Sequence, residues 1–474
     1  MTSILQQVDL AGLDAAYRTD LAQGRAGLVY DGPVSAHLAH GDRRLRHLRF
    51  DPAPASRSLW NFLLSEGARL AAARRDGRRL VAAIKDLGPI PVLAGALPHV
   101  LPFALDGAWW IPCLMEQSDG LLQQADALGV DASFCPVRAM LGVYLPPPPG
   151  AVATCHYPPP DLITCSAGAI CDDVSAIVQR LQGLGLPVAW WEMPRRRAPD
   201  AGEEGVALPG GLWAARSQVD LVASELRRLA SVIATPATGP LDEARLAASI
   251  HAANAIRGRI RRLRQLVFDA PQPPLPALEM LIVEMLAIHF CSDRSACAQV
   301  LDDLVALVHQ RLAAGVGSVA PDAVRVLWIN PVADLRAMSV IEELGGRVCA
   351  SDFLFTHSLE DIAEDAPPFT ALAANALADP MVGSCAERAA LVVDQARRHR
   401  IEAAVVSRIP GASHCAYEGS RIAAALGSAL DIPTVEIEVP VMSDSLDPAL
   451  RTRIEALLET VRGRRGRRRH EDRR

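Results

Sequence analysis

The stretch DLITCSAGAICDDVSAIVQRLQGLGLPVAWW, residues 161–191, decides the fold class of this chain. Its apolar start, DLITC, predicts a buried strand, and the small residues SAGAI that follow it predict a loop. The run VSAIVQRL (174–181) predicts an amphipathic helix, and PVAWW (187–191) predicts a second buried strand. A strand, a helix and another strand in this order indicate a parallel sheet.

The same alternation recurs on both sides of a long helical section. Further strands are predicted at LVAAI (80–84), AVATC (151–155), VRVLWI (324–329), GRVCA (346–350), AAVVS (403–407) and TVEIEV (434–439). From about residue 214 to 315 the strand signal gives way to long amphipathic patterns, which predict helices. We therefore expect an α/β fold with two Rossmann-like parallel-sheet domains, a helical N-terminal region and a helical middle section.

The domain boundaries follow from these changes of pattern. We expect a mainly helical N-terminal region at 1–75, a first α/β domain at 76–213, the helical middle section at 214–318, a second α/β domain at 319–461 and an Arg-rich disordered tail at 462–474. The tail is expected to be disordered because it has almost no apolar residue to bury.

Composition excludes several classes of protein. The chain has 474 residues, of which 50% are hydrophobic and 22% charged, a balance typical of globular proteins and not of disordered ones. No apolar run approaches the roughly 18 residues of a membrane span. The first residues lack the pattern of an export signal, so we expect a cytoplasmic location.

The charged residues restrict the partners. The net charge is −6 and the tail carries about +6, so the body is near −12 and is not expected to bind nucleic acid. Lys85 is the only lysine, which excludes a P-loop because that motif requires a lysine. Any nucleotide hydrolysis is therefore expected from a separate protein. No G-x-G-x-x-G motif supports a dinucleotide site.

Three of the ten cysteines share one context. No two cysteines form a C-x-x-C pair, so zinc ribbons and local ferredoxin motifs are not expected, and a cytoplasmic chain is not expected to form disulfides. Cys135 precedes Pro136 and an apolar run, whereas Cys171 and Cys415 each follow a predicted strand and its loop. All three are expected where a helix begins, and there the backbone N–H groups favour a thiolate or a negatively charged metal–sulfur cluster.

Two interpretations are compatible with these residues alone. Thiolates from three distant loops suit an iron–sulfur cubane with one iron free of cysteine, and such an iron can act as a Lewis acid toward a substrate oxygen. Alternatively, they are three unrelated loop or core cysteines, because a free cysteine is usually a small buried hydrophobic residue.

Seven segments of the chain together have a distinctive order and spacing. They are FCPVRAMLG (134–142), PPPDLITCSAGAIC (158–171), GLPVAWWEMP (185–194), LWINPVADLRAMSVIEELGGRV (327–348), SCAERAALVVDQARRHRIEAAVVSRIPGASHC (384–415), DIPTVEIE (431–438) and LRTRIEALLE (450–459). In their order and spacing across nearly 400 residues, they resemble the enzyme family of the 2-hydroxyacyl-CoA dehydratases and ATP-dependent benzoyl-CoA reductases.

The resemblance implies a cofactor, a reaction and partners. It implies that Cys135, Cys171 and Cys415 bind a 4Fe–4S cluster. The implied function is that of an enzyme subunit that performs low-potential one-electron reduction of a CoA thioester, as a lyase or as an oxidoreductase. The implied partners are a related second subunit, in a hetero- or homodimer, and a separate ATP-hydrolysing activator protein. Neither nucleic acid nor a membrane is expected as a partner.

Departures from the family pattern leave alternatives open. The sequence AICDDV around Cys171 differs from the Thr-Cys-Asp-Gly type of dehydratase subunits, and residues 111–135 are more similar to benzoyl-CoA reductase-like subunits. Cys113 is a candidate further ligand for a double-cubane cluster in a reductase of small molecules. A non-catalytic cluster-bearing partner subunit and a metal-free two-lobed α/β small-molecule-binding module are further alternatives. Cys291, Cys297 and Cys349 are expected to be structural residues.

Overall fold

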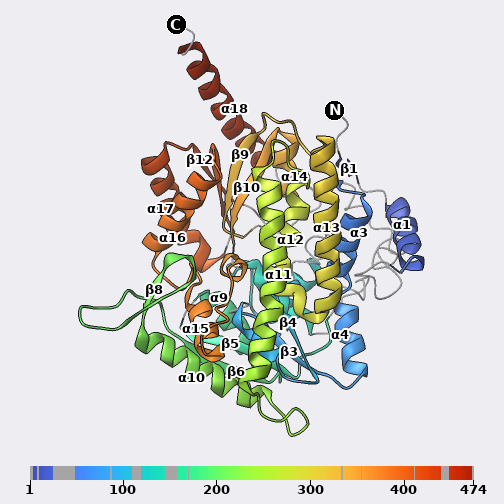
Figure 1. Cartoon of the computed structure of the whole chain (residues 1–474), viewed down its shortest axis with the longest axis vertical. Coiled ribbons are helices and arrows are strands. Elements are labelled where there is room, and N and C mark those ends of the chain that lie inside the picture. Colours follow the sequence, from blue (N-terminus) through green and yellow to red (C-terminus); the bar gives the residue numbers. More distant parts are fainter. Residues whose placement is uncertain are drawn as a thin grey trace.

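The chain forms two parallel sheets joined by helices (Figure 1). The computed structural model describes residues 4–7, 10–24, 49–85, 88–108, 119–144, 157–168, 170–331, 335–353, 355–409, 411–438 and 448–471. Each sheet has four strands, and all pairs within the two sheets are parallel. The predicted α/β class with two Rossmann-like sheets is therefore confirmed.

The first sheet has the strand order β4-β3-β5-β6. Its strands are β3 (Arg79–Ala83), β4 (Val100–Ala104), β5 (Leu162–Gly168) and β6 (Val188–Met193), and its crossover helices include α5 (Pro89–Ala94) and α9 (Asp172–Gly183). The strands predicted from 80, 161 and 187 are present within one or two residues, whereas the one predicted at 151–155 lies outside the described residues. Strand β4 was not predicted because it contains Pro102, which an edge strand tolerates.

The second sheet repeats the topology of the first, with the order β10-β9-β11-β12. Its strands are β9 (Val324–Ile329), β10 (Gly346–Asp352), β11 (Ala403–Arg408) and β12 (Thr434–Glu438), and its helices are α14 (Arg336–Glu343), α16 (Cys385–Arg398) and α17 (Ser413–Leu430). In both sheets the first strand in the chain pairs with the second on one side and with the third on the other. The strand order therefore reverses between β3 and β5 and again between β9 and β11, and ligands of open α/β sheets bind at such switch points.

The helical middle section connects the two α/β units. It consists of α10 (Arg216–Ile233), α11 (Glu243–Asp269), α12 (Ala277–His289) and α13 (Arg294–Ala314). Helix α11 is about 40 Å long and contacts both α5 of the first unit and β10 of the second (Figure 1). Its fully buried Arg257 donates to the carbonyl oxygens of Gly88, at 3.5 Å, and Glu360, at 2.7 Å. Helix α12 is buried along its whole length, which explains why apolar residues occur on all sides of it.

The N-terminal region packs against this middle section. Its described helices are α1 (Leu10–Ala22), α3 (Pro54–Leu64) and α4 (Glu66–Arg75). The fully buried carboxylate of Asp51 accepts hydrogen bonds from Arg311 of α13 at 2.5 and 2.8 Å. The other described elements are β1 (Gln6–Gln7), β2 (Arg49–Phe50), α7 (Asp119–Ala127), η2 (Pro136–Ala139), α8 (Met140–Val143), β7 (Gly205–Ala207), η4 (Pro209–Gly211), β8 (Trp213–Ala215), η5 (Phe290–Ser292), η6 (Thr356–Leu359) and α15 (Pro368–Leu377).

The C-terminal segment differs from the sequence-based expectation. Helix α18 (Pro448–Glu471) continues through most of the segment expected to be a disordered tail (Figure 1). Arg465 forms an ion pair with Glu402, and Arg462 donates to the carbonyl oxygen of Leu344 at 2.5 Å. Residues 462–471 are therefore helical where the sequence suggested disorder, and Arg462 and Arg465 bind acceptors on the second domain without burying apolar side chains. In the described part of the chain, no helix has both the length and the apolar character that a membrane span requires.

Candidate functional site

The first switch point carries the only lysine and one of the candidate cysteines. Lys85 lies two residues beyond β3 and is only 4% exposed, and its Nζ donates a long hydrogen bond of 3.4 Å to the carbonyl oxygen of Ser166 in β5. Cys171 follows β5 after a turn in which Gly168 and Ile170 adopt positive φ angles of 95° and 62°. The turn places Cys171 at the N-cap of α9, as the sequence predicted.

The thiol of Cys171 is half-buried in a mixed electrostatic environment. Burial raises its pKa above the ordinary value, and the carboxylate of Asp173, whose Oδ2 lies 3.8 Å from Sγ, acts in the same direction. The backbone N–H groups of Val174 and Asp173 and the charge of Lys85 lower that pKa. The N-terminus of α9 therefore supplies the N–H donors that were expected to favour a thiolate there.

Cys135 begins a shorter helical segment than the sequence suggested. It is the N-cap of the 3-10 turn η2, which is followed by the single turn α8, and it is 8% exposed. Arg138 of η2 is buried and donates to the carboxylate of Asp126 in α7 at 2.9 Å, which fixes η2 to that helix. Because η2 is one short turn, its dipole favours a thiolate less than the dipole of α9 does.

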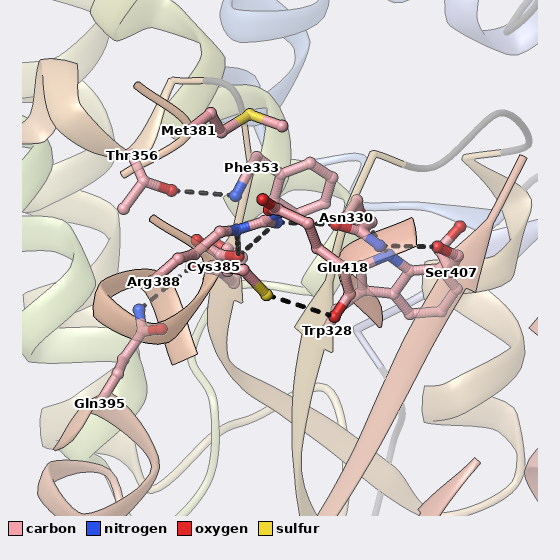
Figure 2. A network of polar contacts seen from close by, with 12 residues as sticks. Trp328, Asn330, Phe353, Thr356, Met381, Cys385, Arg388, Gln395, Ser407 and Glu418 are labelled. Carbon is pink, nitrogen blue, oxygen red and sulfur yellow. Dashed lines mark hydrogen bonds and ion pairs between the residues drawn. The ribbon is translucent and has the colours of Figure 1, made fainter. Parts of the chain in front are cut away.

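The second switch point is held by a buried polar network (Figure 2). Asn330 lies directly after β9 with a left-handed φ of 72° and donates through Nδ2 to the carbonyl oxygen of Ser407 in β11 at 3.1 Å. The guanidinium of Arg388, from α16, donates to Asn330 Oδ1 at 2.7 Å, to Asp352 Oδ2 at 2.7 and 2.9 Å and to Glu418 Oε2 at 2.7 Å. One arginine thus links the ends of β9 and β10 to helix α17.

This network sits one turn from the third candidate cysteine. Cys415 is the third residue of α17, near its N-terminus as predicted, but its side chain is not among those described. Glu418 follows it by three residues and accepts the hydrogen bond from Arg388. Gly419 packs close to the sheet, since a Cβ there would lie 2.6 Å from Val406 Cγ1. The first turns of α17 are therefore anchored to the carboxyl edge of the second sheet.

The three cysteine-bearing segments meet. Helix α9 contacts both η2 and α17. The loop before α17 touches the segment that carries Cys135, because a Cβ on Gly411 would lie 2.5 Å from the carbonyl oxygen of Phe134. Backbone segments that are far apart in the sequence, from both α/β units, are thus brought together at the two switch points. Among the side chains that the structure describes, no group of three or more His, Cys, Asp or Glu is arranged to hold a metal ion, and Cys415 is not among these side chains.

The donors at this junction fit an anionic iron–sulfur cluster. Thiolates are the usual protein ligands of such clusters, and N–H groups of a helix N-terminus compensate their negative charge. Cys171 has such donors, and Lys85 adds a positive charge that acts on the same thiol. The carboxylate of Asp173 is the one described group near Cys171 Sγ that opposes an anion there.

The cysteines expected to be structural lie in the core. Cys291, Cys297 and Cys349 are at most 5% exposed. Burial raises the pKa of Cys291 to about 12 and also raises the pKa values of Cys297 and Cys349. Cys113 lies outside the described residues, so the structure does not bear on its role as a further ligand.

A buried acid–base group near the end of β4 was not anticipated from the sequence. His289 Nδ1 lies 3.1 Å from Glu66 Oε2, and its Nε2 lies 3.4 Å from Asp106 Oδ2. Tyr157 also donates to Glu66 Oε2, at 3.1 Å. The two carboxylates raise the pKa of His289 to about 10, although burial, the largest single influence, acts to lower it. The members of this group lie far apart in the sequence, so no local sequence motif indicates the group.

The sequence analysis also did not predict the Arg388 network, although one of its residues, Asn330, has a recognisable sequence context. Asn330, at the end of a strongly predicted strand, is a residue type that tolerates left-handed backbone conformations and turns. Arg388 and Glu418 carry no such signal, because one among many arginines on a helix predicts no particular partner.

Comparison with known families supports one assignment. A family model described as 2-hydroxyglutaryl-CoA dehydratase, D-component, matches residues 90–461, which is well over half of the chain. The matched range contains the second sheet, three of the four strands of the first sheet and all three candidate cysteines, whereas β3 lies before it. A comparison with curated proteins finds no match.

Proposed function

Because this chain belongs to the 2-hydroxyglutaryl-CoA dehydratase D-component family, we propose that it is the iron–sulfur subunit of an enzyme that reduces a CoA thioester by one electron. The reaction is either the dehydration of a 2-hydroxyacyl-CoA or a benzoyl-CoA reductase-like reduction. The family supports the first outcome more directly, because its description names a dehydratase component.

One observation carries the proposed site. The segments bearing Cys135, Cys171 and Cys415 meet at the switch points of two sheets with the same topology. Cys171 and Cys415 are topologically equivalent, since each lies at the start of the helix that follows the third strand of its sheet. We assign these three thiolates as the ligands of a 4Fe–4S cluster.

The residues of this chain would have separate tasks at that site. When bound, the cluster supplies low-potential electron transfer and an iron that is free of cysteine. The N–H groups at the start of α9 would stabilise its negative charge, and the Arg388 network would hold the first turns of α17 in place. His289, Glu66 and Asp106 would form a rigid, charged group near the end of β4.

The enzyme is proposed to have at least two further protein parts. The word component in the family description supports a multi-component enzyme, and a related second subunit is the proposed partner. The absence of a P-loop from the sequence supports a separate ATP-hydrolysing activator as the source of electrons.

Anaerobic purification of cysteine variants tests the ligand assignment. Cys135→Ser, Cys171→Ser and Cys415→Ser should each lose most of their iron, sulfide and brown absorbance, because a three-thiolate site has no spare ligand. The matched control is Cys349→Ala, which removes a thiol buried in the second domain and should keep its iron, with a loss of about 1 kcal/mol in stability. Full cluster occupancy in Cys171→Ser or Cys415→Ser would refute the assignment.

The iron content of the wild-type protein separates the remaining alternatives. About four iron atoms per chain support the proposed cluster, whereas about eight support a double-cubane cluster with Cys113 among its ligands. A colourless protein without iron after anaerobic purification would favour a metal-free binding module. Turnover only after a sister subunit is added would be compatible with a non-catalytic role for this chain.

A further inference from the structure

A fully buried histidine of the helical middle section is held between two carboxylates. His289, the last residue of α12, is 1% exposed, and its two ring nitrogens face different acids. Nδ1 lies 3.1 Å from Glu66 Oε2, and Nε2 lies 3.4 Å from Asp106 Oδ2. Tyr157 donates to the same oxygen of Glu66, at 3.1 Å. These four side chains, the His289 group, form a continuous chain of polar contacts with Tyr157 at one end and Asp106 at the other.

The His289 group is closed to solvent at one end and open at the other. Tyr157 and Glu66 are 4% and 1% exposed, whereas the side chain of Asp106 is 19% exposed. The only described side chain that interacts with Asp106 by hydrogen bond or ion pair is that of His289. A proton on the buried imidazole can therefore reach the surroundings through Asp106.

Asp106 lies at the edge of the first sheet where ligands are expected. Strand β4 ends at Ala104, so Asp106 follows two residues beyond the carboxyl end of its strand. Ligands of open parallel sheets bind beyond these ends. Strand β3 lies between β4 and β5, and neighbouring strands are about 4.8 Å apart, so the backbone of Asp106 is roughly 10 Å across the sheet from the end of β5. Asp106 thus shares the ligand-binding edge of this sheet with Cys171, which follows β5.

Stability alone does not account for the two carboxylates. The charges of the group balance, because Arg69 of α4 is buried nearby and its positive charge acts on Tyr157. The hydrogen bonds do not balance, because Glu66 Oε1 and Asp106 Oδ1 are buried without a hydrogen-bond partner among the described residues. A buried carboxylate oxygen without a donor is costly, and a catalytic role is one reason for keeping such an oxygen in a folded protein.

We propose that Asp106 transfers protons between His289 and a substrate bound beyond the first sheet, with Glu66 as the positioning residue that fixes the imidazole. In the acid direction, His289 Nε2 gives its proton to Asp106, and Asp106 gives this proton to the substrate. In the base direction both transfers are reversed. Because Nδ1 faces Glu66, the neutral imidazole keeps its remaining proton on that nitrogen.

In the proposed dehydratase, on which this part of the inference rests, Asp106 would serve both halves of the elimination. Water forms from the hydroxyl group on one carbon and a hydrogen on the next, and the overall change is redox-neutral. The leaving hydroxyl group needs a proton, and the neighbouring carbon must lose one. A group that donates to the oxygen and accepts from the carbon ends in its starting state, so no further proton donor is needed.

The first experiment uses the whole chain without substrate, labelled with nitrogen-15 at histidine, and follows the exchange of ring N–H protons with water by NMR. Below its pKa of about 10, His289 carries a proton on both nitrogens, and its signals are assigned by their absence from His289→Gln. In Asp106→Asn, exchange at Nε2 should slow by roughly tenfold or more, because it then requires local opening of the fold.

A matched control and a second variant complete this experiment. Asp302→Asn removes an exposed carboxylate from α13 and should leave the exchange at His289 unchanged. Asp106→Ser is used if Asp106→Asn does not fold. Exchange at the wild-type rate in the folded Asp106 variant would overturn the role of Asp106 as the proton path of His289.

The second experiment uses the cluster-loaded protein with its second subunit and activator, and 2-hydroxyglutaryl-CoA as the probe. At equal iron content, Asp106→Asn should lower kcat by about a hundredfold or more with little change in KM, and Asp106→Glu should recover part of the rate. Asp302→Asn should match wild type. A wild-type kcat in Asp106→Asn would overturn the catalytic role. Wild-type protein that takes up no iron, or that does not turn over this thioester, would instead count against the proposed function, and the exchange experiment would still decide on the proton path.

Discussion

Replacing Arg388 with methionine should destabilise the protein strongly, because this arginine is the only described cation bound to both buried carboxylates at the second switch point. The side chain is 1% exposed, and those of its partners Asp352 and Glu418 are 6% and 12% exposed. The partners hold the pKa of the guanidinium above its ordinary value in spite of burial. Breaking a buried pair of this kind costs about 3–5 kcal/mol, since it leaves uncompensated charge in the interior.

The same helix provides a matched control. Arg397 in α16 forms an ion pair with Asp394, but the two side chains are 55% and 65% exposed. Arg397→Met should therefore change the unfolding free energy by at most about 0.5 kcal/mol. Both variants can be compared by urea unfolding followed by circular dichroism, with iron per chain measured in parallel.

Two further results would complete the test of Arg388. Adding Glu418→Gln to Arg388→Met should recover part of the lost stability, because it removes one of the unpaired buried charges. Iron content should fall in Arg388→Met, because Glu418 then loses its contact one turn from Cys415. A loss below about 1 kcal/mol for Arg388→Met would show that the network does not hold this region together.

Three other outcomes can be checked with the same methods. The pKa of His289 is raised from 6.5 to about 10, so its contribution to stability should be complete below pH 6.5 and should be lost as the pH rises to 10. The urea midpoint of the wild-type protein should therefore fall between pH 6.5 and pH 10, and it should fall less in His289→Gln. Deleting residues 462–474 should cost about 1 kcal/mol through lost partly exposed ion pairs, and an unchanged midpoint would support a disordered tail after all. Gly411→Ala, at a φ of 79° and against Phe134, should lower both stability and iron content. Gly427→Ala, with open space around it inside helix α17, should leave the iron content unchanged and raise stability by about 0.5–1 kcal/mol.

Strands and helix starts were accessible from the sequence because their signals are local. Seven of the eight strands of the two sheets match runs of apolar residues, and the eighth, β4, escaped because Pro102 argues against a strand. Cys171 was correctly predicted to begin a helix, since the residues on both sides of it differ sharply in pattern. The extension of helix α18 over residues 462–471 was not foreseen, because apolar content says nothing about arginines such as Arg462 and Arg465 that have acceptors on another part of the fold.

The sequence by itself determined the α/β class, the approximate order of strands and helices, and the choice of three cysteines as candidate ligands, because each of these depends on residues close together in the chain. Only the tertiary structure decided that both sheets have the same strand order, that the loop before α17 touches the segment of Cys135, and that Lys85 and Asn330 each donate across a switch point to the third strand of the sheet. The Arg388 and His289 groups also became visible only there, since their members lie up to 223 residues apart. Such contacts form because a buried charge needs an oppositely charged or hydrogen-bonding partner in the folded protein, and the spacing of residues along the chain does not indicate which residue that partner is.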